Sequence, residues 1–393
     1  MPAASRIILL VLIVGMAAMG PLGMHIILPS MPGLQAVFAT DYATVQLTLT
    51  FYFVAFAVAQ LVYGPLSDRF GRRPVILTGL SLFLAGNLAC MLAQSIEALI
   101  AGRVLQAIGA CAGMSLGRAI IRDVYSRERA ASVMAYVTTA IVVAPMIGPT
   151  LGGIIDVTLG WRYVFGFVLL LGTAIFLASV FALEETHTQR GVVTSVRAML
   201  GSYGVLLAHR EFVGYALPTA CIVAAFFGFI GSAPYVVVTL MGRPPHEYGF
   251  YFIFIAGAFM LGNLIAGRIT PRVGGDRMIL IGCMLTITGA TIQAVIVFAG
   301  WLTPISFFAP MVLINFGNGF AMPNGNIGAV SVDPARAGAA AGLTGFLQMG
   351  LGAVVSHSVG LAMSDSAVPV VIAYLILSAG ALLVHVWGTR PVR

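Results

Sequence analysis

The side chains best placed for proton chemistry in this chain are a histidine and an arginine in apolar surroundings. His25 follows an uncharged run from Ile7 to Met24, and Arg103 lies well inside another apolar run. Imidazole titrates near pH ~6.5 when unperturbed, so His25 can exchange a proton near neutral pH. A membrane-centred arginine costs about 2.5–3.5 kcal/mol, so Arg103 is expected to face a bundle interior with partners. The alternatives are a neutral histidine hydrogen-bonded across helices and an arginine that reaches the outer membrane interface.

Carboxylates are missing where a proton-driven membrane protein would use them. None of the 13 Asp and Glu residues falls clearly within an apolar run. A buried carboxylate normally attracts a cationic substrate, so its absence favours neutral or anionic substrates over cationic ones. Aromatic side chains can still attract cations through their π faces. His25 is therefore the leading candidate for proton coupling or substrate contact.

The composition predicts an all-α membrane protein. Hydrophobic residues make up 60% of the 393 positions, and the mean hydropathy is +1.01, whereas soluble domains are about 45–50% apolar. A bilayer-spanning helix needs about 20 apolar residues. Twelve such helices are expected, near 6–29, 43–63, 75–94, 98–121, 131–155, 162–183, 212–240, 250–269, 278–299, 305–331, 338–362 and 369–388.

The basic residues indicate membrane topology rather than nucleic-acid binding. All 20 are arginine, and they lie singly or in small groups between apolar runs. Sixteen fall at the termini and in the even-numbered loops, whereas only Arg162 and Arg243 fall in the opposite loops. Positive residues concentrate on the cytoplasmic side, so both termini are expected in the cytoplasm. The first apolar run has no convincing cleavage site and is interpreted as a retained span rather than a signal peptide.

A charged segment and its degraded copy divide the chain into two halves. Gly64–Val75 reads GPLSDRFGRRPV and is expected to form a short cytoplasmic loop. Gly267–Met278 lies 203 residues later and repeats its two glycines and one arginine, with Pro271 in place of Asp68. We therefore predict an N-terminal six-helix bundle (1–183), a central cytoplasmic segment (184–211) and a C-terminal six-helix bundle (212–393). Apolar residues recur at helical spacing in the central segment, which fits an interfacial helix or a plain linker.

GPLSDRFGRRPV resembles the loop 2–3 signature of the major facilitator superfamily. The twelve spans, central segment and second copy extend the likeness over the whole chain. The resemblance implies two pseudo-symmetric six-helix bundles that rock around a central cavity. Ion pairs of Asp68 with the arginines are expected to hold an inner gate; the alternative is that these charges only fix topology. The inner-gate residues are Gly64, Asp68, Arg69, Gly71, Arg72 and Arg73.

Two further segments resemble motifs of proton-coupled exporters in this superfamily. The segment from Arg103 to Gly109 resembles the helix 4 motif of the proton-coupled branch, where the arginine is associated with proton transfer. The segment from Ala144 to Gly153 resembles the helix 5 motif of exporters, with the alternative of a packing kink alone. Its motif residues are Pro145, Gly148, Pro149 and Gly152.

The finer resemblance is to the bicyclomycin-resistance (Bcr/CflA) drug-efflux subgroup. It is carried by Gly20–Pro29, Gly117–Asp123 and Ala337–Ala353. That subgroup usually has an acidic residue in helix 1, and this chain has His25 instead. The departure raises the weight of a dedicated metabolite exporter or facilitator with weak or absent proton coupling.

Aromatic and amide side chains within the spans are candidates for the substrate cavity. Amides in a membrane helix mark either interhelical hydrogen bonds or a wet cavity, and single aromatics are more often packing residues. The candidates are Tyr52, Phe56, Phe226, Phe227, Tyr235, Asn315, Asn318, Asn324 and Gln348.

The function expected from the sequence is multidrug efflux by proton antiport in a bacterial inner membrane. No cofactor or metal site is expected, since the four cysteines show no metal-ligand or disulfide spacing. No nucleophile–base pair, phosphate loop or zinc motif supports the opposing class, a membrane enzyme or sensor. One twelve-span chain can enclose a pathway, which favours a monomer.

Overall fold

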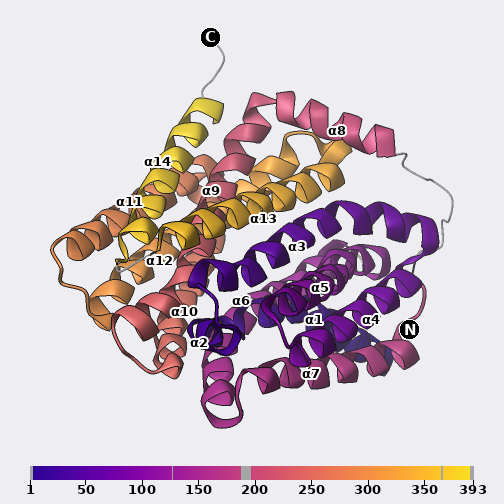
Figure 1. Cartoon of the computed structure of the whole chain (residues 1–393). Coiled ribbons are helices and arrows are strands. Elements are labelled where there is room, and N and C mark those ends of the chain that lie inside the picture. Colours follow the sequence, from indigo (N-terminus) through magenta and orange to yellow (C-terminus); the bar gives the residue numbers. More distant parts are fainter. Residues whose placement is uncertain (1–2, 126, 187–195, 364–365, 390–393) are drawn as a thin grey trace. The chain divides into compact units, whose positions relative to one another are not determined.

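The computed structural model describes residues 3–125, 127–186, 196–363 and 366–389 (Figure 1). Its regular structure throughout those ranges is helical. The chain divides into two compact units, unit 1 (Met1–Thr194) and unit 2 (Ser195–Arg393). The predicted all-α membrane class is confirmed.

Unit 1 contains seven α-helices and one 3-10 turn in the described ranges. They are α1 (Ala3–His25), η1 (Leu28–Ser30), α2 (Met31–Phe38), α3 (Tyr42–Phe70), α4 (Arg72–Met91), α5 (Ile96–Val124), α6 (Arg127–Leu159) and α7 (Trp161–Ala182). Unit 2 contains α8 (Val196–Ala208), α9 (Arg210–Tyr235), the π-helical turn η2 (Val236–Leu240), α10 (Pro245–Val273), α11 (Gly275–Phe298), α12 (Pro304–Ser331), η3 (Pro334–Arg336), α13 (Ala337–Ala362) and α14 (Val368–Thr389).

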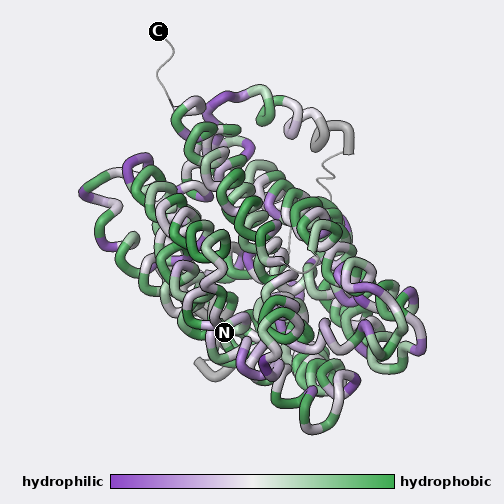
Figure 2. The backbone as a smooth tube through the Cα atoms, turned by 60° about the vertical axis from the view of Figure 1, so that its left-hand side comes forward, coloured by the Kyte–Doolittle hydropathy of each residue, from purple (hydrophilic) through white to green (hydrophobic). Residues whose placement is uncertain are grey.

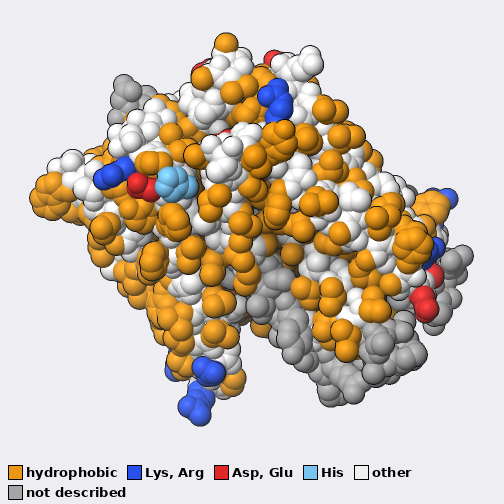
Figure 3. All heavy atoms as spheres, turned by 90° about the horizontal axis from the view of Figure 1, so that it is seen from below, with side chains coloured by type: hydrophobic (Ala, Val, Ile, Leu, Met, Phe, Trp, Pro, Cys, Tyr) orange, Lys and Arg blue, Asp and Glu red, His pale blue; other side chains and the backbone are white. Residues whose placement is uncertain are grey.

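The long helices have the length and composition of membrane spans. Eleven qualify among the described residues, and α6 adds a shorter described apolar stretch, Val143–Leu159. Figure 2 shows hydrophobic residues along the helices and hydrophilic ones gathered near the turns. Large apolar side chains such as Leu170 and Phe181 are 69% and 86% exposed. Hydrophobic side chains are spread over the face shown in Figure 3, with few charged ones among them, as expected for contact with lipid.

The prediction of a loop over Gly64–Val75 was wrong. Helix α3 continues through Pro65 to Phe70 and α4 begins at Arg72, so Gly71 alone separates them. Gly71 has φ +99°, a conformation that glycine tolerates and other residues rarely adopt. The same arrangement recurs in unit 2, where Gly274 (φ +91°) separates α10 from α11.

Close approach at glycines fixes α4 onto α5. A Cβ atom at Gly109 would lie 2.2 Å from the backbone nitrogen of Phe83, and one at Gly86 would lie 2.3 Å from that of Gln106. No side chain fits at either place, so the two backbones touch. We call this contact the α4–α5 seam; it sets the positions of the polar side chains described next.

Helix α8 occupies part of the predicted central segment 184–211. Leu206 of α8 is fully buried against Phe212 of α9 and Leu343 of α13. The helix therefore packs on its own unit. Its placement at a membrane interface stays a prediction.

Candidate functional site

The charged residues of the Gly64–Val75 segment form one connected cluster in unit 1. Arg72 is 3% exposed. Its Nη1 donates to Asp68 Oδ1 at 2.6 Å and to Ser67 Oγ, and its Nε donates to Asp123 Oδ2 at 3.2 Å. One guanidinium thus bridges the end of α3 and the end of α5, and two carboxylates balance its charge.

Glu185, which follows α7, caps the N-terminus of α4. Its carboxylate oxygens accept hydrogen bonds from the backbone N–H groups of Arg72 (2.9 Å) and Arg73 (3.3 Å). A helix N-terminus carries unpaired N–H groups and partial positive charge, so a carboxylate there is stabilising. A Cβ at Gly71 would lie 2.3 Å from Glu185 Oε2, so only glycine leaves room for this cap.

Arg73 and Arg69 have different surroundings in the same segment. Arg73 donates from Nε to the Leu183 carbonyl (2.7 Å) and from Nη2 to the Val180 carbonyl (2.8 Å). Arg69 is exposed, and its Cζ lies 5.0 Å from the centre of the Phe70 ring. Gly64 lies within α3 with open space at its Cβ position. The structure therefore gathers Asp68, Gly71, Arg72 and Arg73 in one cluster and leaves Gly64 and Arg69 outside it.

Sequence reasoning missed Asp123 and Glu185 as members of this cluster. Asp123 enters the sequence-based predictions only as the last residue of the Gly117–Asp123 motif, and Glu185 only within the central segment 184–211. Because they lie 51 and 113 positions from Arg72, no local spacing reveals the contact. Their signal is chemical: each is an acidic residue at the end of an apolar span, on the side where the arginines gather.

A second group of polar side chains, the polar centre, is buried between α1, α3, α4 and α5. Arg103 is 1% exposed. Its Nη1 donates to the Gly23 carbonyl at 2.8 Å and to Gln106 Oε1. Gln106 Nε2 in turn donates to Asn87 Oδ1 at 2.7 Å. The prediction that Arg103 faces the bundle interior with partners therefore fits the geometry, although a role in transport stays a prediction.

Aromatic side chains complete the polar centre. The Arg103 guanidinium lies 4.3 Å from the centre of the Tyr52 ring, a cation–π contact. The Tyr52 hydroxyl donates to the Gly20 carbonyl at 3.0 Å, and Phe56 stacks beside Tyr52 at 6.2 Å. Two of the predicted cavity residues thus lie next to the predicted arginine.

Arg103 retains hydrogen-bonding capacity. Its Nε and Nη2 atoms are buried and have no hydrogen-bond partner among the residues that the structure describes. Every Asp or Glu within a described helix lies in its first or last turn. No described carboxylate pairs with Arg103. The polar centre therefore offers N–H donors to an oxygen atom that is not supplied by these residues.

His25 ends α1 beside the predicted exporter motif of α6. It is 4% exposed, and its Nδ1–H donates to the Pro21 carbonyl at 2.8 Å. A Cβ at Gly148 would lie 3.5 Å from the Cβ of His25, and one at Gly152 would lie 1.8 Å from the Ile26 carbonyl oxygen. The small residues of α6 therefore let it press against the end of α1. Pro145 and Pro149 lie inside α6.

The predicted cavity residues of unit 2 fall into two groups. Phe226 packs on Phe252, with ring centres 6.1 Å apart, within a large aromatic cluster. Phe227 fills the space at Gly352, where a Cβ would lie 2.3 Å from its ring. Tyr235 is partly buried at the end of α9. These aromatics are packed as part of the helix bundle.

The amides form the other group, on α12 and α13. Gln348 Nε2 donates to Asn326 Oδ1 (2.9 Å) and Thr219 Oγ1 (3.2 Å). Asn318 accepts from Thr286 at 3.0 Å. Asn315 and Asn324 donate to carbonyls of their own helix, at 2.9 and 2.8 Å. Asn326, which the sequence interpretation did not single out, joins α12 to α13.

The described part of the chain contains no cluster of side chains suited to metal binding or to thiol chemistry. No group of three His, Cys, Asp or Glu side chains gathers there. Cys90, Cys111, Cys221 and Cys283 are free and buried.

Comparisons with known proteins agree with the fold. The sequence profile of the Major Facilitator Superfamily matches residues 9–357. The chain is 30% identical over 367 residues to the uncharacterized MFS-type transporter YdgK of Bacillus subtilis, covering 92% of this chain and 90% of that protein. It is 32% identical over 314 residues to a chloramphenicol resistance protein of Pseudomonas aeruginosa, covering 77% and 73%. Multidrug resistance protein D of Escherichia coli is 28% identical over 351 residues, covering 89% and 88%.

A solved structure extends the agreement to the backbone. The xylose transporter XylE from E. coli superposes with a TM-score of 0.77 at 12% identity, covering 99% of this chain and 98% of that one. At that identity the likeness concerns the fold alone. The profile match and the relatives are those of membrane transporters and not of enzymes. The chain belongs to the major facilitator superfamily.

Proposed function

We propose that this protein is a secondary active exporter of small amphipathic compounds that works by alternating access and proton antiport. Relatives named for chloramphenicol resistance and multidrug resistance support drug efflux as the activity. The arginine distribution supports a multi-pass protein of the bacterial inner membrane with both termini in the cytoplasm. A monomer is the simplest functional unit, because one chain supplies all the spans.

The observation that carries the substrate assignment is Arg103 in the polar centre. A buried guanidinium with unused donors is costly unless an oxygen atom completes its hydrogen bonds. A substrate carbonyl, nitro or carboxylate oxygen would do so, and the nearby ring of Tyr52 would contact the apolar part of the same molecule. Neutral or anionic substrates therefore fit better than cations, which the guanidinium repels.

His25 is proposed as the proton-coupling residue. It lies at the end of α1, where α6 packs closely, so a charge change there acts on a contact between helices. Arg103 supplies fixed positive charge in the same unit, so protonating His25 and binding an anion at Arg103 are electrostatically linked. Exchange of proton and substrate requires that each event weaken the other; attraction of an anion to a protonated His25 works against this, so we assign the coupling to the change that protonation of His25 causes in the α1–α6 contact.

The inner-gate cluster is proposed to hold one conformation of the transporter. Arg72 and its two carboxylates join the ends of α3, α4 and α5, and Glu185 adds the segment after α7. Such a network holds the ends of these helices together, so that they can move as one rigid unit when the gate opens or closes.

The experiment uses purified protein in liposomes with an imposed pH gradient. Chloramphenicol counterflow and proton release are measured together for the unaltered protein, His25→Ala and Arg103→Met. The proposal expects His25→Ala to keep downhill chloramphenicol flux while losing at least tenfold in pH-driven accumulation. Unchanged pH-driven accumulation in His25→Ala would refute the coupling role.

The second candidate is a dedicated exporter or facilitator of one metabolite with weak or absent proton coupling. The observation favouring it is the lack of a carboxylate in the middle of any described span. Resistance profiles in a host lacking its own efflux pumps separate the two. Tolerance to several unrelated compounds supports drug efflux, whereas a response to one compound supports the dedicated exporter.

A further inference from the structure

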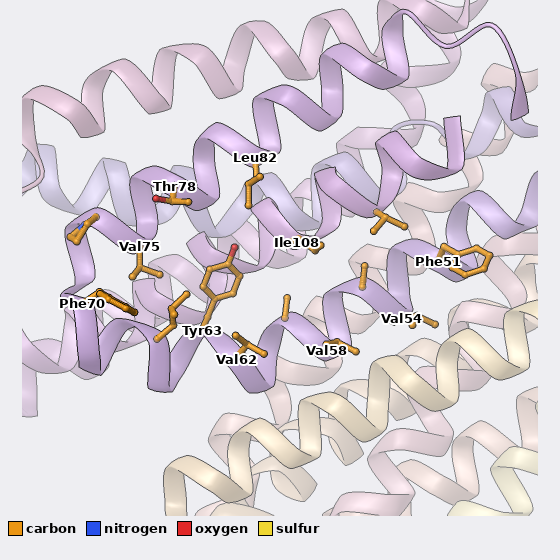
Figure 4. Close-up of a pocket in the computed structure, with 15 residues that line it drawn as sticks. Phe51, Val54, Val58, Val62, Tyr63, Phe70, Val75, Thr78, Leu82 and Ile108 are labelled. Carbon is orange, nitrogen blue, oxygen red and sulfur yellow. The ribbon is translucent and has the colours of Figure 1, made fainter. Parts of the chain in front are cut away.

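A long apolar groove lies on unit 1, apart from the polar centre (Figure 4). Its volume is about 700 Å³. Helix α3 provides one wall, α4 the other, and Val104 and Ile108 of α5 contribute between them. The lining is almost wholly hydrophobic, with Tyr63 and Thr78 as its residues with hydroxyl groups. None of Tyr52, Phe56 and Arg103 lines this groove.

The groove is a consequence of the α4–α5 seam. Glycines at 79, 86 and 109 bring α4 and α5 into backbone contact. Helix α3 also packs along α5, but α3 and α4 make few contacts with each other. A helix drawn tightly onto one neighbour is held away from the other, so a channel open on one side remains between α3 and α4. Its shape is therefore built into the backbone.

The groove is long enough to take a lipid acyl chain. Its α3 wall runs along a membrane-spanning helix from Phe51 to Phe70, which are separated by 19 residue-to-residue steps. At 1.5 Å per residue this wall is about 28 Å long, close to the ~30 Å thickness of a bilayer's hydrocarbon core. One leaflet supplies only about half of that core, so an acyl chain that entered from the Phe70 end would occupy the part of the groove nearer Phe70 and leave the Phe51 end free.

A free cation stands at the Phe70 end. The Arg69 guanidinium is stacked on Phe70, which lines the groove, and it makes no ion pair with any described residue. The neighbouring Arg72 and Arg73 are instead held by carboxylates and carbonyl oxygens. Of the three arginines in this turn, Arg69 is thus the one available to an external anion.

We propose that this groove binds one anionic phospholipid, with an acyl chain between α3 and α4 and the phosphate on Arg69. Charge complementarity selects the headgroup, since an arginine near the membrane surface attracts anionic lipid. The apolar lining selects the chain, because it offers no polar groups for a drug-like molecule beyond two hydroxyls. The proposal is independent of the substrate assigned to the polar centre.

The first test compares lipids and matched arginines. Full-length protein is titrated with phosphatidylglycerol or phosphatidylcholine, and bound lipid is counted by native mass spectrometry. Arg272 occupies the place of Arg69 in the second copy of the motif, so Arg272→Gln removes an equivalent charge. The proposal expects Arg69→Gln to weaken phosphatidylglycerol binding about fivefold and Arg272→Gln to leave it unchanged. Equal binding of both lipids, or equal losses in both variants, would overturn it.

The second test fills the groove. Val58 lines the groove and is 51% exposed, and Leu261, at the corresponding place on α10, is 53% exposed. Val58→Trp is expected to displace the tightly bound phosphatidylglycerol, whereas Leu261→Trp retains it. Melting curves of both variants check that they fold. A Val58→Trp protein that folds and binds the lipid normally contradicts the proposal. The proposal is also wrong if this variant loses export of one compound while its lipid binding is unchanged, because the groove then takes substrate.

Discussion

The α4–α5 seam of unit 1 and the α11–α12 seam of unit 2 share a backbone design but carry different side chains. Gly79 and Gly86 recur 203 positions later as Gly282 and Gly289. A Cβ at Gly86 would meet the backbone nitrogen of Gln106 at 2.3 Å, and one at Gly289 would meet the side chain of Ile314 at 2.6 Å and its backbone nitrogen at 3.2 Å. Arg103 lies three residues before Gln106, and Met311 lies three residues before Ile314. Both units have therefore kept close helix contact, and both seams carry buried polar side chains, but among the described residues the buried arginine at the seam occurs in unit 1.

The turns between the paired helices show the same contrast. Gly71 and Gly274 both adopt positive φ at the single-residue break. After the break, Arg72 and Arg73 are replaced by Gly275 and Asp276. Asp276 accepts a hydrogen bond from the Tyr215 hydroxyl at 2.7 Å, which ties it to α9. Backbone geometry is thus common to the units, and the buried guanidinium network belongs to unit 1. Four predictions test this division.

Removing the buried guanidinium of the turn has the largest expected effect. Arg72→Ala leaves Asp68 and Asp123 without their shared cation, and breaking such a pair costs about 3 kcal/mol. Thermal unfolding in detergent should show a clear fall in melting temperature together with loss of export. Arg272→Ala, which removes an exposed charge, serves as control. Similar melting temperatures for the two variants would mean that the arginine network does not distinguish the units.

Adding a methyl group to either seam should destabilise both units alike. In Gly109→Ala the new Cβ meets the Phe83 nitrogen at 2.2 Å, and in Gly317→Ala it meets the Gly282 carbonyl oxygen at 2.6 Å. Overpacking of this kind costs about 1–3 kcal/mol. The control is Gly257→Ala on α10. The added Cβ meets no atom within 4 Å there, so this substitution should be neutral or slightly stabilising. The measurement is again the melting temperature; a tolerated Gly109→Ala would show that the α4–α5 seam is not tight.

Replacing Arg103 of unit 1 by methionine, the residue at the corresponding place in unit 2, should reduce transport without lowering the melting temperature. Arg103→Met replaces the buried cation with the side chain found at Met311. Apolar replacement of a buried charge is often neutral or stabilising, so the melting temperature should hold or rise by a few degrees. Substrate-driven transport should fall by at least tenfold, because the donors to the substrate are gone. Liposome flux and melting temperature are measured on the same preparation; full activity would remove Arg103 from the proposed site.

The smallest effect concerns the helix caps. Asp41 caps α3 by accepting from the Thr44 N–H at 2.6 Å, which lowers the pKa of Asp41 below its ordinary value of 3.8. Because the folded pKa is lowered, the cap stabilises the protein above pH ~3.8 and is lost as the pH falls through the folded pKa. The corresponding cap residue of α10, Pro244, has no side-chain hydrogen bond.

Asp41→Asn preserves an uncharged cap and should therefore flatten the acid dependence slightly. Melting temperatures between about pH 5 and about pH 3 check this. Identical acid profiles for the two proteins would show that the negative charge of this cap contributes nothing measurable to stability.

Much of the helical framework could be predicted from the sequence because long apolar runs have few alternatives in a membrane. The predicted helix 305–331 coincides with Pro304–Ser331, and 338–362 with Ala337–Ala362. The predicted loop at Gly64–Val75 is wrong because charged residues and proline favour a loop in general but are accommodated in helices here. Pro65 is accommodated inside α3, and one glycine of positive φ reverses the chain.

The candidate site was only partly predictable. Arg103 was identified because a charge in an apolar run needs partners, but its contact with the Gly23 carbonyl depends on how α1 packs against α5. Glu185 was missed because a carboxylate that caps another helix leaves no mark near the residues that it binds. Side-chain type indicates which residues require partners; the partners themselves depend on tertiary packing.

Backbone contact along the α4–α5 seam also fixes the distance between these two helices. With glycine at 79, 86 and 109 leaving no gap, neither helix can slide or tilt against the other without a clash. A pair of spin labels on lipid-facing positions of α4 and α5 would hold one separation while the protein turns over. That fixed distance provides a reference against which movements elsewhere in the chain can be measured.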